Sequence, residues 1–240
     1  MILPDPHPGF FGKVRSHGDF VARRLPASFT RVWDDWLQAA LRASREQLGP
    51  GWLGTYLNSP IWRFALAPGA CGPHAWAGVL MPSVDRVGRH FPLTIAAGGV
   101  GAAPLLDWMA LAQVHAWYDS LETLALSSLL DDFSLDTFDA TLRLNAAPPG
   151  ADACGDAPPV GPRGHVMALP DLDALGGAIP QLSRMIAAAT LEGHSLWWTQ
   201  GSQQVAPCVL VHPGLPAARS FTALLDGQWR AHGWHGSNAL

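Results

Sequence analysis

The fold is decided by three apolar stretches that follow one another closely: IWRFALA at Ile61–Ala67, AWAGVLM at Ala75–Met81 and FPLTIAA at Phe91–Ala97. Each has the length and the apolar content of a buried strand. The connections between them, PGACGP at 68–73 and PSVDRVGR at 82–89, are short and rich in turn residues. Connections this short favour antiparallel neighbours over crossovers, so the sequence predicts three antiparallel strands.

Helical patterns and further strands flank this central unit. After Ser28, the predicted N-cap, apolar residues recur at helical spacing until Gly49. They are Trp33, Trp36, Leu37, Ala40, Leu41 and Leu48. Further helices are predicted after Pro104 and at 134–144, 171–191 and 221–225, and further strands at 10–14, 165–169, 195–199 and 205–211, the last two as a hairpin. This order predicts an α/β fold with a mixed sheet and helices on its faces.

The composition is that of a single packed domain. The 240 residues are 48% hydrophobic and only 14% charged, which supports a sizeable core and excludes a disordered chain. Residues 146–164 are rich in proline and glycine, and we interpret them as an excursion within one domain that spans 1–240. Residues 229–240 are expected to form a loose tail.

Charge and cysteine content exclude several classes of protein. The net charge is −4 and Lys13 is the only lysine, so a nucleic-acid-binding protein is not expected. The longest weakly polar run, 91–106, is broken by prolines, and the N-terminus lacks the pattern of a signal peptide. Cys71, Cys154 and Cys208 lie too far apart for a disulfide framework. We therefore expect a cytoplasmic protein without direct membrane insertion.

Two glycine-rich segments do not predict nucleotide binding. Gly9–Val14 has two residues between its glycines where a P-loop needs four. Gly99–Pro104 follows a predicted strand, but Pro104 stands where a dinucleotide-binding loop needs its third glycine. The ten histidines are scattered and match no spacing typical of metal ligands. We therefore predict neither a cofactor nor a metal.

One group of residues would suit a hydrolase. Ser83, Asp85 and His90 lie between two predicted strands, and Cys71 lies in the preceding turn, so Ser83 or Cys71 is the candidate nucleophile. However, the members of a catalytic triad usually come from separate loops, and the Gly-x-Ser-x-Gly motif is absent. A turn in which Ser83 and Asp85 bond to the local backbone is the favoured interpretation, with no catalytic residue.

Arginines near the same loop form a more specific candidate site than the hydrolase group. Arg63 lies inside an apolar strand, where a guanidinium needs a counter-charge, and Asp85 is its predicted partner. Arg86 and Arg89 follow in a loop that contains a glycine. Two interpretations stay open: an ion pair that stabilises the fold, and a site that docks an anion or a protein.

Several motifs occur in order along the chain. They are GFFGK (9–13), GDFV (18–21), LP (25–26), WDDWL (33–37), SPIWRFAL (59–66), GVLMPSVDRVGRHFPL (78–93), SLWWT (195–199) and GLP (214–216). Together they resemble the TagF family, also called ImpM, of accessory proteins of bacterial type VI secretion systems. The resemblance is dense from residue 9 to about 97 and thin from 98 to 190.

The resemblance implies a cytoplasmic, single-domain α/β protein built as a three-layer sandwich. It also implies a regulator rather than an enzyme, namely a post-translational repressor whose partner is the forkhead-associated (Fha) scaffold protein of the secretion system. Residues predicted to contact that partner are Trp62, Arg63, Ser83, Asp85, Arg86 and Arg89.

Overall fold

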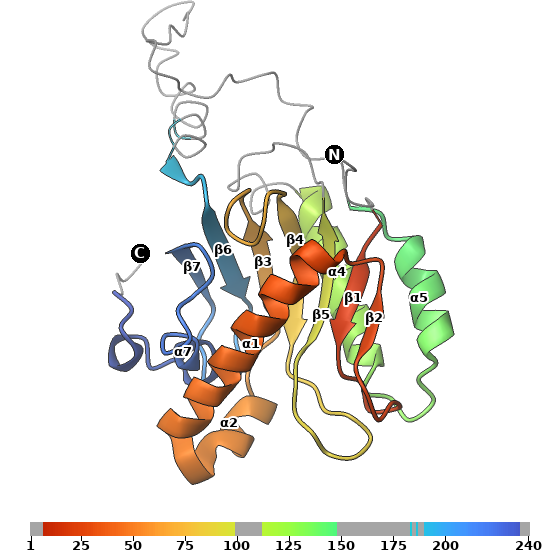
Figure 1. Ribbon diagram of the computed structural model, residues 1–240, viewed down its shortest axis with the longest axis horizontal. Coiled ribbons are helices and arrows are strands. Elements are labelled where there is room, and N and C mark those ends of the chain that lie inside the picture. Colours follow the sequence, from red (N-terminus) through yellow and green to blue (C-terminus); the bar gives the residue numbers. More distant parts are fainter. Residues whose placement is uncertain (1–6, 99–111, 148–182, 184–185, 187–189, 236–240) are drawn as a thin grey trace, which may run out of the picture.

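The computed structural model describes residues 7–98, 112–147, 183, 186 and 190–235. Their strands form one sheet in the order β2-β1-β5-β4-β3-β6-β7 (Figure 1). The strands are β1 (Gly9–Gly12), β2 (Val21–Arg23), β3 (Trp62–Leu66), β4 (Trp76–Met81), β5 (Leu93–Gly98), β6 (His194–Thr199) and β7 (Cys208–Pro213). Strands from both halves of the chain therefore share one sheet.

All hydrogen-bonded pairs of these strands are antiparallel. The three central stretches are confirmed as β3, β4 and β5, and the hairpin is confirmed as β6 and β7. The mixed sheet expected from the order of elements is wrong. The reason is that β3, β4 and β5 are joined by short loops, while β1 and β6 enter the sheet running opposite to their neighbours β5 and β3.

The described helices are α1 (Ala27–Leu48), η1 (Gly49–Gly51), α2 (Trp52–Leu57), α4 (Ala112–Ser127), α5 (Leu135–Arg143), α7 (Thr222–Asp226) and η2 (Arg230–His232). The helix α1 begins before the predicted cap, Ser28. Pro26 is the N-cap, with ψ of 151°, and its carbonyl accepts the amide of Thr30 at 3.0 Å. Proline suits this place because its missing N–H is not needed there. In α5 the Ser134 hydroxyl caps the helix by accepting the amide of Thr137.

Alternation along the strands creates two apolar faces of the sheet. One face packs against α1, α2 and α7, and Phe64 and Trp197 lie at its centre. The other packs against α4 and α5, and includes Ala65 and Leu196. Figure 1 shows α1 crossing the near face of the sheet and α4 behind it. The chain is thus an α/β protein with helices on both faces of its sheet.

Trp33 illustrates how the aromatic residues contribute to this core. Its ring is fully buried, stacks parallel to Trp197 at 5.9 Å between centroids, and contacts Phe64 at 4.9 Å. Its indole N–H donates to the Thr94 hydroxyl at 2.8 Å. The hydrogen bond removes the cost of burying a polar atom, so the whole ring contributes to packing.

The chain from 229 to 235 packs against the protein, whereas the sequence predicts a loose tail from residue 229. Trp234 donates its indole N–H to the Ser220 carbonyl at 2.8 Å, and His232 lies 2.8 Å from the Asp226 carboxylate. Trp229 and Trp234 contact each other edge to face. Removing these aromatic rings from water is favourable, which explains why this segment packs where the sequence predicts a loose tail.

Several predicted elements lie outside the described residues. They are the start of the helix after Pro104, most of the segment 146–164, the strand at 165–169 and nearly all of the helix at 171–191. Of the helices that are described, none combines the length and the apolar character needed to cross a bilayer.

Candidate functional site

Two loops meet at one end of the sheet. Residues 13–20 join β1 to β2, and residues 82–92 join β4 to β5. Because β1 pairs with β5, both loops leave the sheet at the same end, at the bottom of Figure 1. The Ser83 hydroxyl donates to the Lys13 carbonyl at 2.7 Å, which ties one loop to the other.

Asp85 lies at the centre of the contact between these loops. Its carboxylate accepts hydrogen bonds from Lys13 Nζ at 2.8 Å and from Arg89 Nε at 2.6 Å. The backbone amides of Val87 and Arg89 also donate to it, at 3.0 and 2.9 Å. Burial raises the pKa of Asp85, but the hydrogen bonds from Lys13 and Arg89 outweigh burial and hold that pKa well below its usual range. Asp85 is therefore an ionised, fully bonded carboxylate that shapes its loop.

Several side chains of the two loops face solvent. Four of them are Phe20, Arg86, Val87 and Arg89, which we call the loop surface. Val87 is 64% exposed and Phe20 is 43% exposed, although both are apolar. Among the described residues, Arg86 forms no ion pair, and its amide is held by the His17 carbonyl at 2.9 Å. Exposed apolar residues beside a free cation are typical of a protein contact surface.

The predicted ion pair between Arg63 and Asp85 is wrong. Arg63 instead donates to Glu122 from Nε at 2.6 Å and to Asp119 from Nη2 at 2.6 Å. Residue 63 points to the face of the sheet that α4 covers, whereas Asp85 lies in a loop beyond the end of β4. Burial lowers the pKa of Arg63, but the two carboxylates outweigh it and raise that pKa.

Trp62 and Arg63, two of the predicted contact residues, are almost completely buried. They are 2% and 3% exposed and point to opposite faces of the sheet. The Trp62 indole N–H donates to the Leu224 carbonyl at 3.0 Å. Ser83 and Asp85 are also buried and position the loops. Of the six predicted contact residues, Arg86 and Arg89 alone keep an exposed side chain.

The geometry around Ser83 does not support the hydrolase alternative. Its hydroxyl donates to the Lys13 carbonyl rather than to His90, and the side chain is 1% exposed. The backbone of Ser83 is held by Tyr56, whose hydroxyl donates to the Ser83 carbonyl at 2.8 Å and accepts its amide at 2.9 Å. These contacts fix a turn, and among the described residues no base accepts a hydrogen bond from the Ser83 hydroxyl.

Cys71 and His90 are equally unsuited to nucleophilic catalysis. Burial raises the pKa of the Cys71 thiol to about 12, so the reactive thiolate is scarce at neutral pH. The His90 ring lies edge-on against Trp52 and Tyr56, with centroids 5.6 and 5.7 Å away. Burial and the charge of Arg45 lower the pKa of His90.

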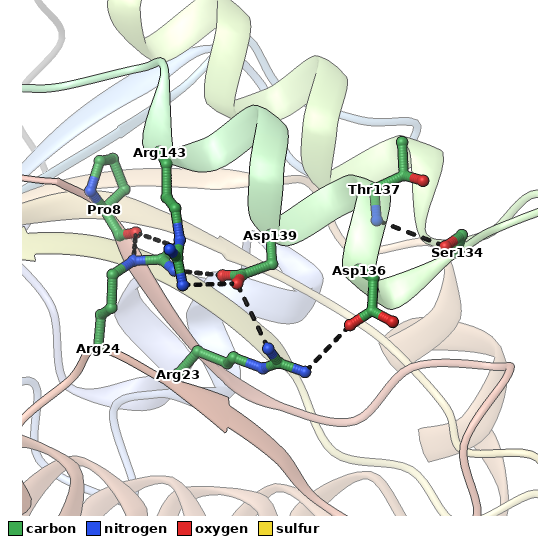
Figure 2. Close-up of polar contacts among 8 residues, drawn as sticks. All are labelled: Pro8, Arg23, Arg24, Ser134, Asp136, Thr137, Asp139 and Arg143. Carbon is green, nitrogen blue, oxygen red and sulfur yellow. Dashed lines mark hydrogen bonds and ion pairs between the residues drawn. The ribbon is translucent and has the colours of Figure 1, made fainter.

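A second charged cluster joins β2 to α5, as Figure 2 shows. The Asp139 carboxylate, nearly buried, accepts hydrogen bonds from Arg24, from Arg23 at 3.4 Å and from Arg143 at 3.3 Å. Arg24 also donates twice to the Pro8 carbonyl, at 2.9 and 2.8 Å. Its φ of 60° lies in the left-handed region, which is unfavourable outside glycine, and these contacts hold it there.

Sequence reasoning missed four residues of these sites. Lys13 is the counter-charge of Asp85. The feature of the sequence that could have pointed to it is that it is the single lysine of the chain. Asp119 and Glu122 are the counter-charges of Arg63, and their three-residue spacing places both on one helix face. Phe20 adds an exposed aromatic ring to the loop surface, and no sequence pattern distinguishes it from the buried phenylalanines.

In the part of the chain that the structure describes, no three His, Cys, Asp or Glu side chains cluster in a way that could hold a metal ion. Cys71 and Cys208, the cysteines in that part, are free thiols.

Comparisons with known proteins find one family. A family model described as TagF N-terminal domain, Type VI secretion system-associated, matches residues 9–144, more than half of the chain. Among solved structures, the chain is similar to the crystal structure of PA0076 from Pseudomonas aeruginosa PAO1. The two share 35% sequence identity with a TM-score of 0.78, and the match covers 92% of this chain and 94% of that one. No curated protein matches the chain.

Proposed function

Because the chain belongs to the TagF family of proteins associated with the type VI secretion system, we propose that it is a post-translational repressor of that system. In this proposal it acts by binding another protein in the cytoplasm, without a cofactor and without catalysis. The partner implied by the family resemblance is the forkhead-associated (Fha) scaffold protein. The match of residues 9–144 to the family is the observation that carries the proposal.

The loop surface supports a binding role for this end of the molecule. It combines two arginines with two exposed apolar side chains on two loops that the buried Lys13–Asp85 ion pair joins. Loops that are cross-linked in this way have less conformational entropy to lose when they bind, which favours affinity. Arg86 and Arg89 are therefore the residues that we place at the interface, with Phe20 and Val87 beside them.

We further propose that residues 1–240 form one TagF-like domain with the layers of a three-layer sandwich. The helices α1, α2 and α7 make one outer layer, and α4 and α5 make the other. Support comes from β6, which pairs with β3 although more than a hundred residues separate them in the chain.

A secretion assay tests the repressor role. Deletion of the gene in the bacterium that encodes it should raise secretion through the type VI system, and the wild-type chain should restore repression. The tagged chain should also retrieve the Fha scaffold from a lysate. Unchanged secretion after deletion, with no retrieval of the scaffold, would contradict the proposal.

Charge reversal on the loop surface tests the binding site. Arg86→Glu should fold normally, since Arg86 forms no ion pair among the described residues, and it should fail to restore repression. The matched control is Arg219→Glu, an exposed arginine outside the loop surface. If both variants repress secretion equally, the loop surface is not the binding site.

A further inference from the structure

We propose that a groove between α1 and the β4–β5 loop docks an acidic segment of a partner protein. The groove has a volume of about 340 Å³ and is open to solvent. It is lined by Gln38, Leu41, Arg42, Arg45, Glu46, His90 and Phe91. The inference rests on the proposed function only for the identity of the partner.

The first argument is the unbalanced charge of the groove. Arg42 and Arg45 project from neighbouring positions of α1, three residues apart on one helix face. Neither forms an ion pair with a carboxylate of the described residues, although Glu46 lines the same groove. Two guanidinium groups thus face one carboxylate that does not bind them. Like charges at this spacing weaken a helix slightly, so an anion bound between them would be stabilised.

The second argument is that Arg45 is held in place before any ligand arrives. Its guanidinium lies over the Trp52 ring, 4.3 Å from the centroid. Trp52 is itself fixed, because its indole N–H donates to the Ser44 hydroxyl at 2.9 Å and its ring stacks on Tyr56. The stacked guanidinium contacts the ring through its flat face. The N–H donors at its edge can therefore still bind a carboxylate in the bidentate geometry that arginine favours.

The third argument is the apolar floor of the groove. Leu41 and Phe91 lie between the polar groups, and both are buried within the protein. Phe91 also contacts Phe20 of the loop surface, with ring centroids 4.8 Å apart. The groove and the loop surface are therefore neighbours, joined by the contact between these two rings. An apolar floor beside two cations fits a peptide that carries carboxylates next to an apolar side chain.

The shape of the groove favours a protein segment over a small metabolite. Sites for small molecules usually enclose most of the ligand, whereas this groove is open to solvent. A protein segment can cover such a groove because it brings further contacts on either side. The loop surface supplies one such flank.

The test uses the full chain and a fluorescein-labelled peptide of alternating glutamate and leucine, with binding measured by fluorescence anisotropy. Arg42→Glu should weaken binding at least about tenfold, the loss expected for one charge-assisted hydrogen bond. Circular dichroism should show that this variant folds, because the Arg42 side chain forms no hydrogen bond or ion pair with the described residues that the substitution would remove. Arg45→Lys keeps the charge without the planar fork and should bind with intermediate affinity.

The matched control is Arg31→Glu, which reverses an exposed arginine on the same helix outside the groove. It should change the affinity less than about twofold, the effect of a distant surface charge. A peptide with glutamine in place of glutamate should bind at least about tenfold more weakly. Equal losses for Arg31→Glu and Arg42→Glu would overturn the proposal, since they would indicate general attraction to a basic surface.

Inorganic phosphate serves as the competing probe. If phosphate displaces the peptide from the wild type at the same concentration at which it binds alone, the groove is a site for simple anions and the proposal of a protein segment fails. Failure of the secretion assay with intact peptide binding would instead contradict only the proposed function. The two outcomes are therefore distinguishable.

Discussion

Asp85 is buried, yet its carboxylate positions the exposed residues of the loop surface. Two cations and two backbone amides converge on it, from two different loops. The loop from Asp85 to Arg89 is closed by the Asp85 amide, which donates to the Arg89 carbonyl at 3.0 Å. Gly88 provides the φ of 86° that this tight turn requires. The exposed arginines thus depend on a buried aspartate for their position.

This arrangement predicts acid sensitivity at Asp85. Its pKa is held below the usual value in the folded protein, so its contribution to stability is complete above about pH 4 and is lost as pH falls further. Asp85→Asn should lower Tm at neutral pH, and the difference from wild type should shrink as pH falls from 6 towards 2. Thermal unfolding followed by circular dichroism across this pH range measures the effect.

The control for this experiment is Asp131→Asn, whose carboxylate is 97% exposed. That substitution should leave Tm nearly unchanged at every pH. Parallel pH profiles for Asp85→Asn and the wild type would show that Asp85 is not the group responsible.

Substitution of Arg63 should have a different effect, because its charge binds α4 to the sheet inside the protein and is not presented to solvent. Arg63→Ala removes the bonds to Asp119 and Glu122 and should lower the free energy of unfolding by about 1.5–3 kcal/mol, the range for a hydrogen bond to a charged group. The exposed arginine variant Arg86→Ala should change it by about 0.5 kcal/mol or less. Urea denaturation measures both, and equal losses would refute the distinction between the two arginines.

At the scale of elements, α5 is attached to the sheet by two kinds of contact. Phe138 is buried and meets Phe10 of β1 edge to face, with centroids 5.2 Å apart. Asp139, the next residue, binds arginines that belong to β2 and the turn after it (Figure 2). The apolar contact provides affinity, and the charged cluster fixes the orientation of the helix.

The Asp139 cluster should therefore be necessary for docking of α5. Asp139→Asn leaves Arg24 without its counter-charge in a largely buried position and should cost about 3 kcal/mol. Hydrogen exchange should then accelerate in α5 more than in α1. The neighbouring Asp136→Asn, whose carboxylate is 90% exposed, should cost about 0.5 kcal/mol or less. Unchanged exchange in α5 of Asp139→Asn would show that apolar contacts alone hold the helix.

At the scale of the whole molecule, the C-terminal hairpin completes the sheet begun by the first half of the chain. Trp197 of β6 is fully buried and contacts Trp33 and Phe64. The pairing of β6 with β3 adds backbone hydrogen bonds to these contacts. A hairpin of this size cannot bury a core by itself.

Splitting the chain tests whether it forms one domain. A fragment of residues 191–240 expressed alone should be unfolded, because its apolar face has no partner. Coexpressed with residues 1–147, it should copurify and show the near-ultraviolet circular dichroism of packed tryptophans. If the fragment 191–240 folds alone, the interpretation as a single domain is wrong.

Much of the fold was predictable from local patterns. The stretches at 61–67, 75–81 and 91–97 are strands, and the apolar face from Trp33 to Leu48 belongs to a helix, because period and turn residues determine such elements locally. The antiparallel order of β3, β4 and β5 followed from the shortness of their loops. The mixed sheet was a wrong prediction because the directions of β1 and β6 depend on distant pairing.

The candidate site was less predictable. The sequence indicated the loop that contains Asp85, Arg86 and Arg89 as charged and turn-rich, and this loop does carry exposed arginines. The partners of its charges were not predictable, because Lys13 lies 72 positions away in the chain. The groove beside α1 was not predictable either, because it forms only where the helix and the β4–β5 loop lie next to each other in the folded protein.

By itself, the sequence determined the local elements, the family to which the chain belongs and the need of Arg63 for a counter-charge. Only the tertiary structure decided which carboxylates meet that need, and it assigned Asp119 and Glu122 to Arg63 and Lys13 to Asp85. The physical reason is the distance along the chain over which each interaction acts. Hydrogen-bond periodicity and turn geometry act over a few residues, whereas ion pairs depend on which distant segments the packing of the sheet and helices brings within a few ångströms.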